Sequence, residues 1–281
     1  MPTPNSVSIS QLYRLIGTSD CPVILDVRTQ EDFDDDPRLL PSALKRDFDK
    51  IDALVSEFSG DKVIIYCQKG LKISQGTAAL LREAGMIAEF LQGGQFGWRD
   101  AEFPMVTASK IPRAQAENSS LWVTRHRPKI DRIACPWLIR RFVDPVAKFL
   151  FVEPSQVMNV SERFGATPFD VEDVKFSHRG EYCSFDVMIE EFGLNSSAPL
   201  NTLAQIVRGA DTNRHDLAPE AAGLLAISAG LSRMYRDDLE QLEAGMLVYD
   251  AFYRWARDAK DEGHDWPSAF PSKQGDAAYA R

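Results

Sequence analysis

The sequence predicts an α/β protein with two domains: a parallel sheet flanked by helices, followed by a helix-rich α+β region. Short apolar, β-branched runs alternate with helical patterns over the first hundred residues, which is typical of a parallel sheet covered on both faces. A polar segment, SKIPRAQAENSS, then interrupts this alternation, and helical patterns dominate the remainder. Because 281 residues suit two domains of ordinary size, we assign residues 1–108 and 119–265 to them.

The first domain is predicted to contain strands and helices in alternation. Buried strands are predicted at residues 22–27, 62–67 and 89–91, where apolar residues run together. Helical patterns follow Ser8, occupy residues 49–58 and run from Ser74 to Ala84. Ser8 and Gln11 have the spacing of a capping box, and Ser74 is placed to cap the third helix. Gly85 suits the end of that helix.

The second domain is predicted to begin with two strands and a helix between them. The strands lie at residues 121–124 and 148–152, and the helix spans residues 131–142. Pro136 must lie in the first turn of this helix or kink it. Further helices are predicted at residues 184–192, 199–208, 219–232 and 237–259, with Ser184 as a cap, Gly193 as a stop and Pro199 in a first turn. The polar C-terminus should be frayed.

Composition and charge narrow the classes of function. The net charge of −9 argues against a large nucleic-acid interface, which needs clustered Lys and Arg to neutralise phosphates. No early segment resembles a signal peptide and no apolar run approaches the ~18–20 residues that span a bilayer, so we expect a cytoplasmic protein without a membrane partner. The four cysteines are widely spaced and contain no CxxC pair, which indicates reduced thiols.

A cysteine-containing loop between the second strand and the third helix is the strongest candidate site. It reads Cys67-Gln68-Lys69-Gly70-Leu71-Lys72. At such a turn the backbone N–H groups converge, and together with the positive helix end they favour an anion and the thiolate form of cysteine. Lys69 and Lys72 add positive charge. The loop therefore suits attack on a sulfane sulfur and stabilisation of a persulfide, although a cysteine at a strand end is more often structural.

Residues 6–106 resemble a single-domain rhodanese. The resemblance rests on LDVR at residues 25–28, the strand end Tyr66-Cys67, the CxxGxK loop and GGxxGW at residues 93–98. It implies sulfurtransferase activity, with Cys67 as the nucleophile that carries a persulfide and Lys72 as the catalytic cation of the loop. It also implies a set of substrate-binding residues, namely Gln68, Lys69, Gly70, Leu71 and Arg28. The implied partners are a sulfur donor such as thiosulfate and a thiol acceptor, and no cofactor is required for the transfer.

The sequence departs from the rhodanese pattern in two places. Lys72 stands where the family has Arg, which keeps the charge but loses the bidentate fork. The Gly-Ala turn before the second helix is replaced by Leu40-Pro41-Ser42-Ala43, which is a weaker match. Phosphatases of similar fold have a longer loop that ends in Arg, whereas Ile73 follows Lys72 here, so phosphatase and arsenate-reductase chemistry are disfavoured. In the family, Asp26 and Arg28 are mainly structural.

The segment from Trp122 to Phe142 is rich in positive charge. Its cations are Arg125, Arg127, Lys129, Arg132, Arg140 and Arg141. Two interpretations remain open: a solvated helix face with salt bridges to acidic residues, or an anion site formed by Arg125, Arg127 and Lys129 before the helix. Cations at that end oppose the helix macrodipole, at a cost that a bound oxyanion would offset.

A histidine in the segment FSHRGEYCSFD is a candidate metal ligand. If Arg179-Gly180 forms a two-residue hairpin turn, His178 faces Glu181, and Cys183 lies on the same face. Imidazole, carboxylate and thiolate together suit a borderline-soft divalent metal. The predicted ligands are His178, Glu181, Cys183 and His215, with Asp211 as a further candidate. A hydrogen-bonded structural histidine is the competing interpretation.

Residues 120–260 resemble the C-terminal domain of the ChrB-type chromate-resistance family. The matching runs are TRHRPKIDRIACPWLIRRFVDP, FSHRGEYCSFDVMIEEFGL, QIVRGAD and YDAFYRWA. The resemblance implies a role in bacterial chromate resistance or sensing, and some family members regulate the corresponding operons. We therefore expect a sulfurtransferase coupled to chromate resistance, with the chromate oxyanion as a further partner. The alternative is a non-catalytic oxyanion or redox sensor that regulates such a system.

Overall fold

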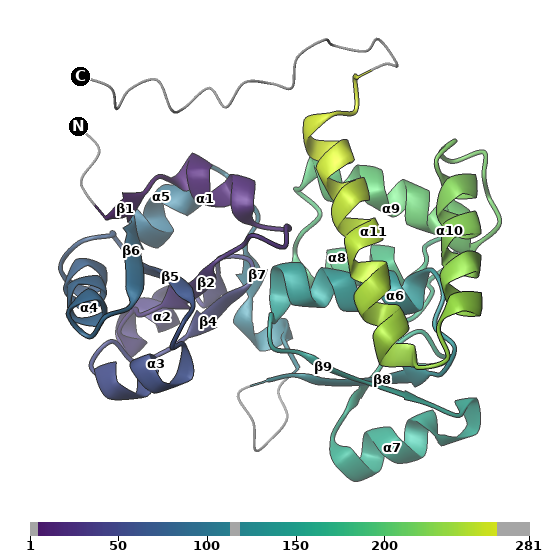
Figure 1. The fold of residues 1–281 in the computed structure, drawn as a ribbon, viewed down its shortest axis with the longest axis horizontal. Coiled ribbons are helices and arrows are strands. Elements are labelled where there is room, and N and C mark those ends of the chain that lie inside the picture. Colours follow the sequence, from purple (N-terminus) through teal and green to yellow (C-terminus); the bar gives the residue numbers. More distant parts are fainter. Residues whose placement is uncertain (1–4, 113–118, 263–281) are drawn as a thin grey trace.

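The computed structural model describes residues 5–112 and 119–262. They form two lobes, with the N-terminal domain on the left of Figure 1 and the C-terminal domain on the right. Part of the predicted linker, and the polar C-terminus that we expect to be frayed, fall outside the described residues. Within the described ranges, no helix combines the length and the apolar character needed to cross a bilayer.

The N-terminal domain is built on a five-stranded parallel sheet, which confirms the predicted fold class. Its strands run in the order β1 (Ser6–Val7), β6 (Ile87–Leu91), β5 (Lys62–Tyr66), β2 (Val23–Asp26) and β4 (Ala43–Lys45). Side chains alternate between the faces, so Ile24 and Ile64 are buried on one face and Leu25 and Ile65 on the other. A second, antiparallel sheet is formed by β3 (Arg38–Leu39) and β7 (Val106–Thr107).

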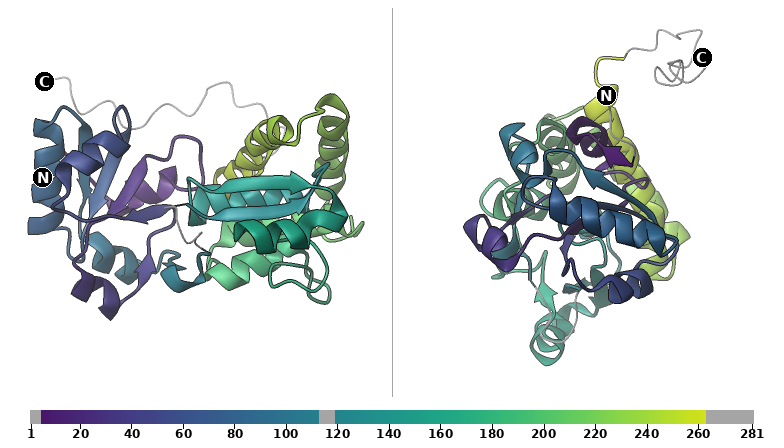
Figure 2. Two further views of the ribbon diagram at one scale, coloured as in Figure 1. Left: turned by 90° about the horizontal axis from the view of Figure 1, so that it is seen from below. Right: turned by 90° about the vertical axis from the view of Figure 1, so that its left-hand side faces the viewer.

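Helices cover both faces of this sheet, as predicted. On the face of Ile24 lie α1 (Ile9–Leu15) and α5 (Gly94–Asp100). On the opposite face lie α3 (Ile51–Glu57) and α4 (Lys72–Glu83). Figures 1 and 2 show α4 on the side of the domain that is turned away from the C-terminal domain.

Local signals set some of the helix ends in this domain. Ser8 and Gln11 form the predicted capping box at the start of α1, and Gly85, with a φ of +88°, follows the end of α4. The prediction that Ser74 caps α4 is wrong, because that helix begins two residues earlier. The sequence pattern does not predict α2 (Gln30–Asp35), since this helix buries no side chain and therefore has no apolar stripe.

The C-terminal domain is helix-rich and also contains a parallel sheet. The strand order is β10 (Thr167–Pro168), β8 (Leu121–Arg125) and β9 (Lys148–Val152). One face is covered by α7 (Val157–Phe164), which packs against Val123. Trp122 points to the other face, where the core is completed by α6 (Asp131–Leu138), α8 (Ser184–Phe192), α9 (Ala198–Asp211), α10 (Ala221–Met234) and α11 (Asp238–Asp258). Single 3-10 turns occupy Ala108–Lys110 and Pro154–Gln156.

Pro136 lies in the middle of α6 rather than in its first turn. Because proline has no N–H to donate, it interrupts the regular hydrogen bonding of the helix. After Leu138 the chain continues as a π-type turn over Ile139–Val143. The helix predicted over residues 131–142 therefore exists, with a change in its winding where the proline disturbs it.

The two domains share one apolar core. The sheet face that carries Ile24 belongs to the same buried cluster as side chains of α6, α9 and α11. At the contact, Gly17 has a φ of +78°, and a Cβ atom there would lie 2.5 Å from the Tyr253 ring and 2.6 Å from the Phe142 ring. The Ser42 amide also donates to the Phe142 carbonyl over 2.7 Å. The N-terminal domain therefore packs directly against the C-terminal helices.

Candidate functional site

Cys67 follows the last residue of β5, at the carboxyl edge of the parallel sheet. Its side chain is buried except for a small part that borders a pocket. The Sγ atom lies 3.3 Å from the hydroxyl oxygen of Ser74, which is the third residue of α4 and is fully buried. Ser74 therefore contacts the candidate nucleophile instead of capping the helix.

The carbonyl groups of the Cys67 loop are held on its outer side. The carbonyls of Cys67 and Gln68 accept hydrogen bonds from the amides of Gln95 and Phe96, over 3.0 and 2.9 Å, at the start of α5. Beyond Lys69, the side chain and the amide of Gln75 donate to the carbonyls of Gly70 and Leu71, respectively. Because each peptide unit is planar, the N–H groups that follow these carbonyls point the opposite way. These N–H groups therefore point away from α5 and Gln75.

Two glycines allow α5 to approach the loop this closely. Gly70 and Gly94 have φ values of +67° and +58° and lie against each other. A Cβ atom on Gly94 would overlap the Cys67 carbonyl oxygen, and one on Gly70 would lie 2.5 Å from the Leu91 carbonyl oxygen. The glycine-rich GGQFGW segment is thus needed for the shape of the Cys67 loop.

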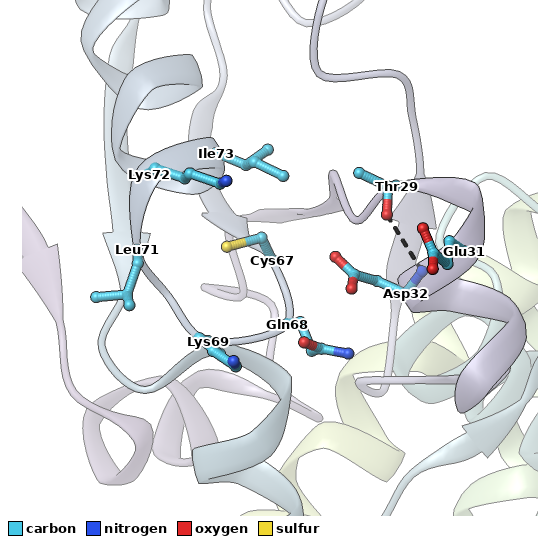
Figure 3. A pocket seen from close by; sticks show the side chains of 9 residues that line it. All are labelled: Thr29, Glu31, Asp32, Cys67, Gln68, Lys69, Leu71, Lys72 and Ile73. Atoms are coloured by element: carbon cyan, nitrogen blue, oxygen red, sulfur yellow. Dashed lines mark hydrogen bonds between the residues drawn. The ribbon is translucent and has the colours of Figure 1, made fainter.

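A cavity of about 540 Å³ opens beside Cys67. It is lined by Thr29, Glu31, Asp32, Cys67, Gln68, Lys69, Leu71, Lys72 and Ile73. Five of these residues are predicted from the loop motif, whereas Gly70 is buried inside the loop and does not line the cavity. Figure 3 shows Thr29, Glu31 and Asp32 facing the loop from the start of α2.

Residues of α2 are the part of the pocket that the sequence analysis misses. The hydroxyl of Thr29 accepts a hydrogen bond from the Asp32 amide over 3.1 Å and so caps this helix. The spacing of Thr29 and Asp32 directly after a buried strand is a helix-start signal that identifies this edge of the sheet. The carboxylates of Glu31 and Asp32 stand across the pocket from Lys69 and Lys72, so the pocket carries both signs of charge rather than positive charge throughout.

Arg28 does not reach the pocket, which corrects its assignment to substrate binding. Its side chain is fully buried, and its guanidinium bonds both carboxylate oxygens of Asp26 at 2.6–3.0 Å. The remaining N–H groups donate to the carbonyls of Asp36 and Arg38. All of these bonds hold the turn after β2, so the role of Arg28 is structural.

Four of the arginines in the basic segment form salt bridges, which favours the first of the two interpretations. Arg125 and Arg132 both bond Asp170, at 3.1 and 3.3 Å. Arg127 donates to the carbonyls of Ser232 and Tyr235 and, through its amide, to Asp238. The last two arginines pair with α11, as Arg140 with Glu243 and Arg141 with Asp250. The arginines therefore join the start of the domain to its acidic helices.

The predicted metal site is only partly assembled. The turn after His178 pairs Arg179 with Tyr182, one residue out of the predicted register, so His178 does not face Glu181 across it. Such a shift turns each side chain to the other face. Glu181 and His215 are exposed, and Cys183 is buried at the start of α8. None of these three belongs to the group of described ligand atoms that includes His178.

His178 instead lies among three aspartates. Its Nε2 atom is 3.5 Å from carboxylate oxygens of Asp131 and Asp170 and 3.2 Å from Asp211. Hydrogen bonds to Asp170 and Asp211 raise the pKa of His178 to about 10. Burial, reinforced by Asp211 and Asp170, raises the pKa of Asp131 well above its usual value. Asp131 is missing from the predicted ligand set because it lies far from His178 in sequence, and Asp170 is missing because it precedes the hairpin segment on which the prediction is based.

Two family profiles match different parts of the chain. The family profile "Rhodanese-like domain" matches residues 8–101, and "ChrB, C-terminal domain" matches residues 122–256. Protein ChrB of Cupriavidus metallidurans is 35% identical over 152 residues, which cover 53% of this chain and 45% of that protein. The match thus spans less than half of that relative's length.

Solved structures resemble the N-terminal part of the chain. A rhodanese-related protein of Thermoplasma volcanium has 17% identity and a TM-score of 0.32, over 37% of this chain and 98% of that one. A rhodanese-like domain protein of Staphylococcus aureus has 25% identity and a TM-score of 0.31, over 34% and 90%. A thiosulfate sulfurtransferase of Pseudomonas aeruginosa has 17% identity and a TM-score of 0.31, over 37% and 19%.

Proposed function

We propose that this chain, which combines a rhodanese-like domain with a ChrB C-terminal domain, transfers sulfane sulfur through a persulfide on Cys67 within a chromate-resistance system. The backbone of the Cys67 loop carries the proposal. Its carbonyl groups are held on the outside by Gln75 and the start of α5, so its amides form an anion-binding surface beside an open pocket.

The reaction transfers one sulfur atom in two displacement steps. The Cys67 thiolate attacks the outer sulfur of thiosulfate, the S–S bond of the donor breaks, and sulfite leaves with the electron pair. Cys67 then holds a persulfide. A thiolate acceptor attacks its outer sulfur and removes it, which returns Cys67 as a thiolate. No external oxidant or reductant is consumed, and the loop amides stabilise the negative charge in both steps.

Side chains around the pocket have different roles in this reaction. The Ser74 hydroxyl, 3.3 Å from Sγ, orients the sulfur and serves as a positioning residue. Lys69 and Lys72 are exposed at the rim and attract the anionic donor. Because Lys72 lacks the bidentate fork of an arginine, recognition of the dianion depends mainly on the amides.

The C-terminal domain supports the link to chromate. Chromate is a tetrahedral dianion that thiosulfate resembles in shape and charge, so the cradle beside Cys67 suits either anion. We infer that the sulfur held by Cys67 serves the response to this oxyanion. The match of residues 122–256 to the ChrB C-terminal domain is the basis of this inference.

Sulfur transfer from thiosulfate to cyanide, and to dithiothreitol, tests the proposed activity. We expect turnover by the full chain and none by Cys67→Ser. Cys21→Ser is the matched control, because it removes a thiol of the same domain that does not line the pocket, and it should retain activity. Equal rates for Cys67→Ser and the unmodified chain would refute the assignment of the nucleophile.

A non-catalytic oxyanion or redox sensor is the second candidate function. Its redox form is favoured by Glu31 and Asp32, whose carboxylates line the pocket and oppose a dianionic donor, whereas oxidation of the Cys67 thiol needs no bound dianion. In that case peroxide would oxidise Cys67, Cys67→Ser would abolish this oxidation, and no thiocyanate would form. Removal of both carboxylates in Glu31→Gln and Asp32→Asn separates the two functions, because it should speed a true transferase at low thiosulfate.

A further inference from the structure

We propose that the C-terminal domain binds one divalent metal ion of the zinc or manganese class between Asp131, Asp170 and His178, with Asp211 adjacent. One donor atom from each of the first three residues lies within 4.8 Å of the others. They come from separate segments, namely the start of α6, the loop after β10 and the loop before α8. The fold therefore brings hard and borderline ligands together at a single point.

The distances from His178 to its carboxylate neighbours fit a coordination sphere. His178 Nε2 lies 3.2–3.5 Å from an oxygen of each of the three aspartates. Ligands held at about 2.0–2.2 Å from an ion in tetrahedral geometry are about 3.4 Å apart. A single N–H on Nε2 can be directed at one carboxylate only, whereas an ion placed between the residues satisfies several of them together.

A buried oxygen atom without a hydrogen-bond partner also indicates a metal ion at this position. Asp131 is 1% exposed, and within the part of the chain that the structure describes its Oδ1 atom has no hydrogen-bond partner. Its other oxygen, Oδ2, accepts the Ser184 amide over 2.6 Å and approaches His178. Buried carboxylate oxygens without a donor are costly, and a metal ion removes that cost.

The surrounding residues orient the ligands and balance their charge. Arg125 and Arg132 bond Asp170 Oδ2, while the Ser184 hydroxyl donates to Oδ1 over 2.8 Å. Partners of this kind fix ligand orientation around metal ions.

Titration of Zn²⁺ and, separately, Mn²⁺ into the chelator-treated full chain tests this site by calorimetry. We expect one ion per chain, and the Mn²⁺ titration avoids binding to thiolates. His178→Ala should weaken binding at least about 100-fold. The side chain of His178 is 42% exposed, so its removal should leave the fold intact. His215→Ala, at an exposed histidine of the same domain, should bind as the unmodified chain does.

Asp131→Asn provides a second test of the metal site, because it keeps the size of the side chain but removes its charge. Electron paramagnetic resonance of bound Mn²⁺ should change in this variant and stay unchanged in Glu181→Gln. The proposal is overturned if neither ion binds at one per chain, or if His178→Ala binds as tightly as the unmodified chain. Sulfur transfer by Cys67 is measured independently, so the two proposals can fail separately.

Discussion

The cysteines of this protein differ in the surroundings of their sulfur atoms. Cys135 and Cys183 are fully buried, and burial raises the pKa of both thiols well above the usual value. Cys21 is half-buried and more exposed than Cys67, yet dense packing around its sulfur raises its pKa to about 11, with a smaller opposing effect from Ser42. Cys21 is therefore the more exposed of these two thiols, yet its raised pKa keeps it protonated near neutral pH.

Alkylation by iodoacetamide at pH 8 should modify Cys67 before Cys21. With a pKa of about 11, Cys21 is only about one-thousandth ionised at that pH, and only the thiolate reacts. Its rate should rise about tenfold for each pH unit up to pH 10, since the pKa lies above this range. Peptide mass spectrometry measures both sites in one sample. Faster labelling of Cys21 at pH 8 would show that exposure governs the order.

At the same scale, sequence reasoning finds residues that adjoin Cys67 and misses those that the fold brings to it. The loop is contiguous, so its motif identifies Lys69 and Lys72. Asp32 reaches the pocket because β2 and β5 pair in parallel, a contact that no local pattern contains. Arg28 belongs to the matching motif but is held by Asp26, which shows that a family motif can mark structure as well as chemistry.

At the scale of elements, the approach of α5 to the Cys67 loop shapes the site. The first amides of α5 bond two loop carbonyls, and this contact requires that Gly70 and Gly94 have no side chains. The seven-residue helix α5 does not line the pocket, yet it determines where the loop amides point. Substitutions in α5 should therefore change the reactivity of Cys67, although no side chain of α5 lines the pocket.

Gly94→Ala should lower both stability and sulfur transfer. The added Cβ overlaps the Cys67 carbonyl oxygen at a φ of +58°, so the loop must shift, at a cost of about 1–3 kcal/mol. Gly76→Ala is the matched control, because this glycine of α4 has no atom within 4 Å of an added Cβ and its change should be neutral or stabilising. Urea denaturation and thiosulfate turnover measure the two effects. Unchanged turnover in Gly94→Ala would contradict this role of α5.

Predictions of helix ends and turns succeed where the structure depends on a few neighbouring residues. They fail where distant packing decides which residues pair. The capping box of α1 and the stop at Gly85 hold because each depends on a few neighbours. The turn after His178 forms around Gly180-Glu181 instead of Arg179-Gly180, since pairing depends on the packing of the flanking residues. That shift removes Glu181 from the predicted metal ligands.

For the whole molecule, the shared core predicts cooperative unfolding. The buried cluster extends from the sheet of the N-terminal domain to α11, and Tyr253 lies at the contact, 1% exposed against Trp137 and Phe142. A domain boundary that sequence composition places near residue 108 says nothing about this contact, because the residues that form it are scattered along the chain. The two domains that the sequence predicts therefore pack together as one unit.

Tyr253→Ala should destabilise both domains together, by about 3–5 kcal/mol, the cost of removing a large buried aromatic side chain. Tyr182→Ala, at a tyrosine that is 55% exposed, should cost about 0.5 kcal/mol or less. Thiol labelling of Cys21 in urea reports on the N-terminal domain, because its raised pKa protects this thiol in the folded chain, and helical circular dichroism reports mainly on the C-terminal domain. Coincident transitions are expected, and two separated ones would show that the domains unfold independently.

The packing at Gly17 limits how the two domains could be separated or exchanged. Its bare Cα atom receives the Tyr253 ring, and no side chain at that position leaves room for it. The first domain produced alone would therefore expose the apolar surface that the Tyr253 ring covers. Joining it to a different second domain would require another group that fills the space over Gly17.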